Sequence, residues 1–259
     1  MATFLFSDII VGPITSRRLG ASLGVNLLPA KRKICSFDCI YCECGFNPPK
    51  GTPPADFPET AGVVSLLEIK LKELAAEGKN PDVITFAGNG EPTMHPAFAE
   101  IIDETVRLRN IYCPNTRIAV LSNTTRIHLP HVFNALLKVD DNILKLDSAL
   151  PETIQKINVP AKAFDLNRTI NYLKRFAGKV IIQTLFVKGN VDGVPVDNTA
   201  DAEVVAWTNL VKEIAPREVM IYPIARDTPV KSLEKPSPEK MNEIAERLKQ
   251  VGIPVRVTL

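Results

Sequence analysis

The chain contains 259 residues, of which 45% are hydrophobic and 23% are charged, and its formal net charge is +2 at pH 7. This composition is typical of a globular protein, and the length suits one large domain because α/β barrels reach this size undivided. The small net charge excludes a strong overall attraction to nucleic acid or to an anionic membrane. Local basic clusters at residues 17–18 and 31–33 are interpreted as solvated surface, with contact to an anionic cofactor or substrate as the alternative.

The N-terminal segment and the cysteine count indicate the cellular compartment. Residues 1–8 have neither a basic start nor a long apolar core, so we expect no signal peptide. No apolar run approaches the roughly 18–20 residues that are needed to span a bilayer. Five cysteines in a chain of this length, without a secretory leader, argue against a disulfide framework. The sequence therefore predicts a cytoplasmic protein with reduced thiols, which forms a single domain over residues 1–259.

The first part of the chain is predicted to be irregular apart from one strand. Residues 9–22 are rich in turn formers and show little periodicity. The apolar run 23–28 predicts a short buried strand, which ends at Pro29. Five prolines stiffen the segment 46–62, which we expect to be an irregular loop rather than a linker between domains.

From residue 65 onward, helices and strands are predicted to alternate. Near-continuous apolar runs predict further buried strands at residues 82–86, 117–121, 143–147, 180–187 and 218–222, with a closing strand at 254–258. Apolar residues at helical spacing predict helices at residues 65–78, 98–105, 131–138, 165–176, 201–214 and 238–251. The first of these helices is predicted to start at a capping box of Ser65 and Glu68.

This alternation of apolar strands with helices predicts a parallel α/β sheet that helices cover. Six strand–helix units suit an incomplete (β/α) barrel, whereas the periodicity alone also allows an open doubly wound sheet. In barrels of this kind the reactive centre lies at the carboxyl ends of the strands. Polar residues that directly follow the predicted strands are therefore the candidates for a functional site.

Three cysteines, Cys35, Cys39 and Cys42, lie in the loop after the first predicted strand with the spacing C-x3-C-x2-C. Thiolates at such spacings can converge on one iron–sulfur cluster. A [4Fe–4S] cluster that is bound by three thiolates keeps one iron open to a further ligand. A structural zinc site is the alternative, but zinc needs a fourth ligand, and Cys44 is the only other thiol nearby. We interpret Cys44 and Cys113 as ordinary thiols, with Cys113 near the end of a helix.

The cysteine spacing, with Tyr41 directly before Cys42, resembles that of the radical SAM superfamily. The resemblance implies a partial (β/α)6 barrel, in which the open iron of a [4Fe–4S] cluster binds S-adenosylmethionine (SAM). One-electron reduction then splits SAM into methionine and a 5′-deoxyadenosyl radical, which abstracts hydrogen from a substrate. The resemblance thus implies an iron–sulfur oxidoreductase that needs an external reductant of the flavodoxin or ferredoxin type.

The resemblance also implies which strand ends bind SAM. Gly90 and Glu91 follow the second strand and resemble the GGE motif of the family, although Asn89 interrupts the glycines here. In the family, the glycine backbone and the carboxylate of this motif hold the methionine ammonium. Ser122 and Asn123 follow the third strand and are expected to bind the ribose or the carboxylate of SAM. Capping of the next helix is the alternative role for these two residues.

The later strands add four candidates. Lys145 and Asp147 alternate with leucines on the fourth strand, so both are expected to point to one face. A buried pair of this kind is costly unless its members meet a ligand or each other, and relatives use such residues for the carboxylate and ribose of SAM. Gln183 on the fifth strand and Tyr222 on the sixth are expected to contact SAM or the substrate.

The sequence does not define the substrate. Segments such as Ser16–Gly20 resemble the branch that contains the wyosine-base tRNA-modifying enzymes, but no cysteine precedes Cys35 to bind the second cluster of those enzymes. A small molecule or a nucleotide is favoured, with glycyl-radical activation and tRNA modification as alternatives. An electron carrier is a different class of function, in which Cys44 is the fourth cluster ligand. Arg226 binds an anionic substrate group or lies at the surface, and His95 is interpreted as an ordinary loop histidine.

Overall fold

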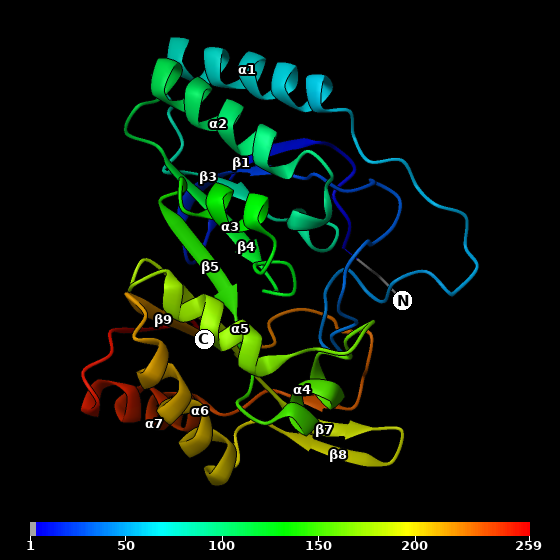
Figure 1. Cartoon of the computed structure of the whole chain (residues 1–259), viewed down its shortest axis with the longest axis vertical. Helices are drawn as coiled ribbons and strands as arrows, with labels where there is room; N and C mark the ends of the chain where they lie inside the picture. Colours follow the sequence, from blue (N-terminus) through cyan, green and yellow to red (C-terminus); the bar gives the residue numbers. More distant parts are fainter. Residues whose placement is uncertain (1–3) are drawn as a thin grey trace.

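The computed structural model describes residues 4–259, and its centre is one eight-stranded sheet (Figure 1). The strand order is β1-β2-β3-β4-β5-β6-β9-β11. β1 pairs antiparallel with β2, and every other neighbouring pair of this sheet is parallel. Because β1 and β11 are separate edges, the barrel is incomplete. The strands are β1 (Ile10–Ser16), β2 (Gly20–Val25), β3 (Val83–Phe86), β4 (Arg117–Ser122), β5 (Asp141–Lys145), β6 (Ile181–Phe186), β9 (Glu218–Pro223) and β11 (Val255–Val257).

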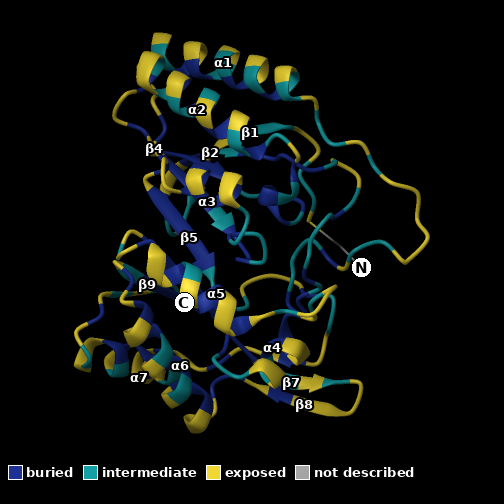
Figure 2. Cartoon of the chain, viewed as in Figure 1, coloured by how far each residue is buried: buried dark blue, intermediate teal, exposed yellow. Residues whose placement is uncertain are grey.

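Helices cover the outer face of this sheet, and in Figure 2 their exposed residues face solvent while the strands are largely buried. None of the helices within residues 4–259 is both long enough and apolar enough to cross a membrane. Residues 1–3, which begin the segment expected not to be a signal peptide, lie outside the described residues. The helices are α1 (Thr60–Ala76), α2 (Phe98–Tyr112), α3 (Pro130–Leu136), α4 (Pro151–Ile157), α5 (Leu166–Arg175), α6 (Asp201–Ile214) and α7 (Pro238–Gln250).

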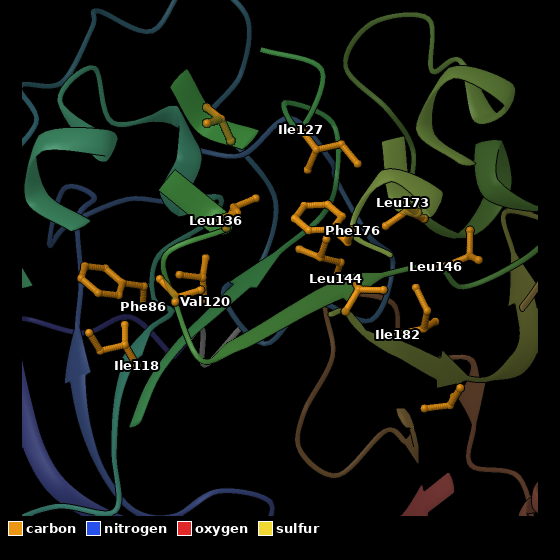
Figure 3. Close-up of a cluster of buried hydrophobic side chains, with 14 of the residues drawn as sticks. Phe86, Ile118, Val120, Ile127, Leu136, Leu144, Leu146, Leu173, Phe176 and Ile182 are labelled. Carbon is orange, nitrogen blue, oxygen red and sulfur yellow. The ribbon is translucent and has the colours of Figure 1, made fainter. Parts of the chain in front are cut away.

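Side chains of the parallel strands alternate between the two faces of the sheet. One set points outward and forms the main hydrophobic core with the helices. Figure 3 shows part of this core, in which Val120 and Leu144 share a cluster with Leu136 of α3 and Leu173 of α5. The other set points into the barrel, where Val83, Ala119, Ile143, Ile181 and Met220 form a smaller cluster with Leu19 of the turn before β2. The same face carries polar side chains toward the carboxyl ends of the strands.

The structure confirms the predicted parallel α/β architecture. The six predicted barrel strands and the closing strand are present as β2, β3, β4, β5, β6, β9 and β11, within a few residues of their expected bounds. The expectation of an irregular segment at residues 9–22 is wrong, because Ile10–Ser16 forms a hairpin with β2. The first barrel strand is Gly20–Val25 rather than residues 23–28 for the same reason. Hydrogen bonds across the hairpin stabilise these strands although their sequence lacks regular alternation.

The helical predictions need two corrections. α1 begins at Thr60, not at a capping box of Ser65, and Glu59 caps it without a side-chain hydrogen bond. The buried face that starts at Val63 extends the helix one turn earlier, so packing overrides the local cap signal. The sequence reasoning also missed α4 and a second sheet of strand order β10-β7-β8. The strands of this second sheet are β7 (Lys188–Val191), β8 (Val194–Asp197) and β10 (Leu233–Glu234).

The burial of α1 leads to a stability prediction. The side chain of Leu71 is completely buried in the main core, whereas Leu66 on the same helix is 44% exposed. We expect Leu71→Ala to lower the free energy of unfolding by about 2–5 kcal/mol, because it removes buried methyl groups and leaves a cavity. Leu66→Ala, the matched control, should change it by less than about 0.5 kcal/mol. Urea denaturation of the two variants measures both, and equal effects would contradict this packing of α1.

Candidate active site

A cavity at the carboxyl ends of the parallel strands gathers most of the predicted site residues. Its volume is about 280 Å³, just below the roughly 300–1,000 Å³ that ligand pockets occupy. Cys35, Cys39 and Cys42 all line it as free thiols. Among residues 4–259, no three His, Cys, Asp or Glu side chains are placed to hold a single metal ion. The lining also includes the predicted residues Tyr41, Gly90, Glu91, Ser122, Asn123, Lys145, Gln183 and Tyr222.

A short backbone pairing attaches the cysteine loop (residues 35–42) to the end of β3. Ile34 and Gly90 form a parallel bridge, in which the Ile34 N–H donates to the Asn89 carbonyl at 2.8 Å and the Glu91 N–H donates to the Ile34 carbonyl at 3.0 Å. Gly90 has φ +136°, and a Cβ atom there would lie 1.8 Å from the Ile34 carbonyl oxygen. The pairing therefore requires glycine at position 90. Because Ile34 is bonded to Glu91, the pairing also brings the next residue, Cys35, close to Glu91.

A second group of hydrogen bonds holds the cysteine loop from the side of the Pro-rich segment. The Asn47 side chain accepts from the Cys35 N–H at 2.8 Å and donates to the Asp38 carboxylate at 2.8 Å. The Lys33 ammonium lies 3.3 Å from Asp38 and donates to the Gly45 carbonyl at 2.9 Å. The Lys33 side chain is only 1% exposed. The expectation of a solvated surface is thus wrong for this lysine, because the folded loop encloses it.

The three thiols of the loop differ in their electrostatic surroundings. Burial raises the pKa of Cys35 to about 12 and also raises the pKa of Cys39. A hydrogen bond from the neighbouring Cys44 thiol lowers the pKa of Cys42, and the same bond raises the pKa of Cys44. Burial disfavours the charge of Lys33, but the three cysteine sulfurs together with Asp38 outweigh burial and raise its pKa. Lys33 therefore contributes a fixed positive charge beside the three thiols.

Glu91 joins the end of β3 to the end of β4. Its residue is 2% exposed, and its carboxylate accepts hydrogen bonds from the Ser122 hydroxyl at 2.8 Å and the Asn123 N–H at 2.6 Å. Burial raises the pKa of Glu91, and these hydrogen bonds oppose the shift. The Asn123 amide also donates to the Cys35 sulfur at 3.4 Å. The alternative that Ser122 and Asn123 cap a helix is wrong, because α3 begins only at Pro130.

Lys145 and Asp147 contact each other, and this contact offsets the cost of burying two charged groups. The Lys145 ammonium lies 3.4 Å from the Asp147 carboxylate and donates to the Tyr41 hydroxyl at 2.7 Å. The Tyr41 hydroxyl in turn donates to Asp147. Burial disfavours the charge of Lys145, but Asp147 together with Tyr222 and Cys39 outweighs burial and raises the lysine's pKa. Asp147 follows the end of β5 and does not line the cavity, so the strand that was expected to present both residues ends at Lys145.

Asn158, the residue after α4, connects this pair to the cysteine loop. Its amide donates to the Asp147 carboxylate at 2.7 Å and to the Cys39 sulfur at 3.3 Å. Sequence reasoning missed Asn158 because it missed α4, which positions it. It also missed the contribution of Asn47 and the burial of Lys33. In the sequence, the only indication of these contacts is that Lys33 lies two residues before Cys35.

The remaining candidates occupy the rim and the wall of the cavity. Gln183 is buried on β6, and Tyr222 lies near the carboxyl end of β9. Arg226 donates to Glu43 at 2.7 Å and its side chain is 59% exposed, so it lies at the outer rim. His95 does not line the cavity, and its ring bonds to a backbone carbonyl of the Pro-rich segment at 2.9 Å. This contact agrees with the interpretation of His95 as an ordinary loop histidine.

The fold and the cavity together define a parallel partial-barrel protein with a three-thiol site at the carboxyl ends of its strands. The chain belongs to the radical SAM superfamily, whose family model matches residues 32–207 and so includes all three cysteines. Proteins of this superfamily use a [4Fe–4S] cluster and SAM, which are therefore the cofactors of this chain.

Individual proteins resemble the chain over part of their length. A UPF0026 protein of Helicobacter pylori is 31% identical over 185 residues, which is 70% of this chain and 57% of that protein. A protein of Brachyspira hyodysenteriae described as GTPase Obg is 27% identical over 90% of this chain and 32% of its own length. A radical SAM methyltransferase from Sphaerobacter thermophilus superposes with a TM-score of 0.66 at 17% identity, over 92% of this chain and 65% of that one. The chain thus spans less than two thirds of each of these proteins, and the structural likeness concerns the fold alone.

The pairing of Ile34 with Gly90 predicts a specific cost of adding one methyl group. We expect Gly90→Ala to lower the free energy of unfolding of the apoprotein by about 2–4 kcal/mol, because the new Cβ collides with the Ile34 backbone and φ is unfavourable. Gly78→Ala is the control, since Gly78 also has positive φ but a methyl group there would meet no atom of residues 4–259 within 4 Å. That control should cost only about 1–2 kcal/mol. Chemical denaturation distinguishes them, and a Gly90→Ala variant no less stable than Gly78→Ala would contradict the close approach.

Proposed function

We propose that the protein is an enzyme that holds a [4Fe–4S] cluster through Cys35, Cys39 and Cys42 and abstracts hydrogen from a small molecule or nucleotide. The observation that carries this proposal is the presence of all three thiols in one cavity that also contains the carboxylate of Glu91 and the ammonium of Lys145. When bound, the cluster and SAM supply a one-electron cleavage that yields methionine and a 5′-deoxyadenosyl radical. The protein supplies binding, orientation and a shielded space.

The donors around the thiols suit a bound anionic cluster. Three thiolates carry three negative charges, and Lys33 provides a buried positive charge beside them. The amides of Asn123 and Asn158 donate to two of the sulfurs, at 3.4 Å to Cys35 and 3.3 Å to Cys39. Hydrogen bonds to cluster sulfurs and nearby charge are the means by which a protein adjusts the potential of a cluster. Residues from separate parts of the chain therefore stabilise the three cysteine ligands.

The strand-end residues suit the methionine end of SAM. An ammonium needs acceptors and a carboxylate needs a cation or N–H donors. We assign the ammonium to Glu91, which Ser122 and Asn123 hold in place, and the carboxylate to Lys145. Gln183 and Tyr222 line the adjacent wall and are assigned to the ribose or the substrate. Asp147 and Tyr41 position Lys145 through their mutual contacts, and Asp147 itself is enclosed.

The position of the three thiols supports a small substrate. The thiols line a cavity rather than an exposed surface, so a compact molecule reaches them more readily than a folded macromolecular surface. The electron for SAM cleavage must come from outside the chain, and we propose a flavodoxin- or ferredoxin-type donor. Asp147 and Glu91 are themselves shielded from water, since the Asp147 side chain is fully buried and Glu91 is nearly enclosed.

The first test is anaerobic reconstitution with iron and sulfide, followed by assay of the reduced protein with SAM for 5′-deoxyadenosine. We expect the wild-type protein to form this product and Cys39→Ala to fall to background, because one cluster ligand is lost. Cys113→Ala is the matched control, since that thiol is buried beside α1 and away from the cavity. A wild-type protein that binds no iron would contradict the proposal.

Cys44 supports a second candidate, an electron carrier whose cluster has four protein ligands. Its thiol lines the same cavity as the three cysteines of the motif, and it donates to the Gly88 carbonyl at 3.4 Å. In the enzyme, Cys44→Ser should keep both the cluster and the formation of 5′-deoxyadenosine. In the carrier, the same substitution should abolish the cluster, and SAM should not alter the electron paramagnetic resonance spectrum of the reduced wild-type protein.

The position of Lys33 predicts a shift of the cluster's reduction potential. Reduction adds a negative charge, which a nearby cation stabilises, so Lys33→Gln should lower the midpoint potential by tens of millivolts. Lys31→Gln removes the same charge from an exposed neighbouring position and should leave the potential nearly unchanged. Redox titration monitored by electron paramagnetic resonance measures both. Equal potentials in the wild-type and Lys33→Gln proteins would show that this lysine lies too far from the cluster to act on it.

A further inference from the structure

Arg18, in the turn between β1 and β2, brings a positive charge into the cavity and has no side-chain acceptor among residues 4–259. Its guanidinium carbon lies 4.4 Å from the ring centroid of Tyr222. Its Nη1 atom is buried and has no hydrogen-bond partner within residues 4–259. A buried N–H group without an acceptor costs free energy. A buried donor without a partner, on a residue that lines a cavity, indicates a position where a ligand can supply the acceptor.

The other cations of this cavity already have acceptors. Each lysine and arginine that lines it, apart from Arg18, contacts a protein oxygen: Lys33 contacts Asp38, Lys145 contacts Asp147, Arg226 contacts Glu43 and Arg17 contacts the Leu259 carbonyl. Among the cavity cations of the described chain, Arg18 is therefore the one whose side chain contacts no protein oxygen.

Arg18 also lies where this cavity adjoins a second one. The second cavity has a volume of about 150 Å³ and lies inside the barrel. Both cavities are lined by Arg18, Leu121 and Gln183. The inner cavity is otherwise mostly apolar, and its Ser22 and Thr85 hydroxyls bond to each other at 2.8 Å. The guanidinium and the Gln183 amide line both cavities, so they are donors that a ligand at this junction can reach.

The location separates Arg18 from the groups assigned to SAM. The Arg18 guanidinium stacks on Tyr222 of β9, and β6 lies between this strand and β5, which carries Lys145. The cation on the cysteine side is Lys145, which contacts Tyr41 of the cysteine loop. The carboxylate of SAM therefore has a cation nearer the cysteines, and Arg18 faces a different part of the bound molecules.

We propose that Arg18, with Gln183, binds an oxyanion of the substrate, a carboxylate or a phosphate, at the junction of the two cavities. A guanidinium offers a planar pair of N–H donors that matches such a group, and the Tyr222 ring holds the guanidinium by stacking. This inference rests on the proposed function and narrows its substrate to a small anionic molecule. The anionic end lies at Arg18, and the carbon that loses hydrogen lies toward the cysteines.

The test measures anion binding by the thermal stability of the reconstituted protein under anaerobic conditions. Sodium phosphate or sodium acetate replaces sodium chloride at constant ionic strength. We expect at least one of the two anions to raise the melting temperature of the wild-type protein by roughly 2–4 °C in a saturable manner. The larger response distinguishes a phosphate from a carboxylate site. Arg18→Gln should lose this response, and Arg18→Lys should keep part of it.

Two controls separate this role from others. Arg107→Gln removes an exposed charge on α2, far from the cavity, and should retain the full anion response. Equilibrium dialysis with SAM should give the same affinity for Arg18→Gln as for the wild type, within twofold. A purely structural role would lower the melting temperature of Arg18→Gln equally in chloride and in phosphate while keeping the anion response.

The outcomes are distinct. No response of the wild type to either anion, or an undiminished response in Arg18→Gln, would overturn the proposal. A tenfold or greater loss of SAM affinity in Arg18→Gln would also overturn it, because Arg18 would then serve SAM. The anion response requires no cleavage of SAM. A protein that shows the Arg18-dependent response but never forms 5′-deoxyadenosine would therefore refute the proposed function alone.

Discussion

The site depends on the backbone pairing between Ile34 and Gly90. A long irregular loop must satisfy its buried N–H and carbonyl groups, and this loop does so by hydrogen bonding to the turn after the neighbouring parallel strand. The pairing brings Cys35 to Glu91, and Glu91 in turn bonds to Ser122 and Asn123 at the next strand end. Three strand ends are thereby connected through one glycine whose missing side chain permits the contact.

Charge pairing organises the rest of the cavity. Taking a charge out of water is costly unless a partner or hydrogen bonds compensate it. Lys145 meets Asp147, and Lys33 meets Asp38 and the three thiols. These cations are therefore held in place before any ligand binds, as a preorganised site requires. Arg18 differs, because its buried Nη1 atom has no acceptor among the described residues, and we propose that the substrate supplies one.

Much of the fold and many site residues were predictable, because both follow from local patterns. Apolar runs located the barrel strands, and the residues after them largely line the cavity, since parallel strands end at one edge. The predictions failed where a contact distant in sequence decides the outcome. The hairpin of β1 and β2 depends on cross-strand hydrogen bonds, and Asn158 acts only because α4 packs near Cys39. The burial of Lys33 likewise depends on a carbonyl twelve residues later.

The sequence by itself determined the parallel α/β class, the three-cysteine motif and the superfamily to which the chain belongs, because periodicity and spacing are properties of neighbouring residues. Only the tertiary structure decided how the charges are matched. It showed that Asp147 positions Lys145 from behind the cavity wall, that Glu91 is held by Ser122 and Asn123, and that Arg18 lacks a partner among the described residues. Whether a charge is buried or paired depends on segments that folding brings together, and no spacing along the chain records it.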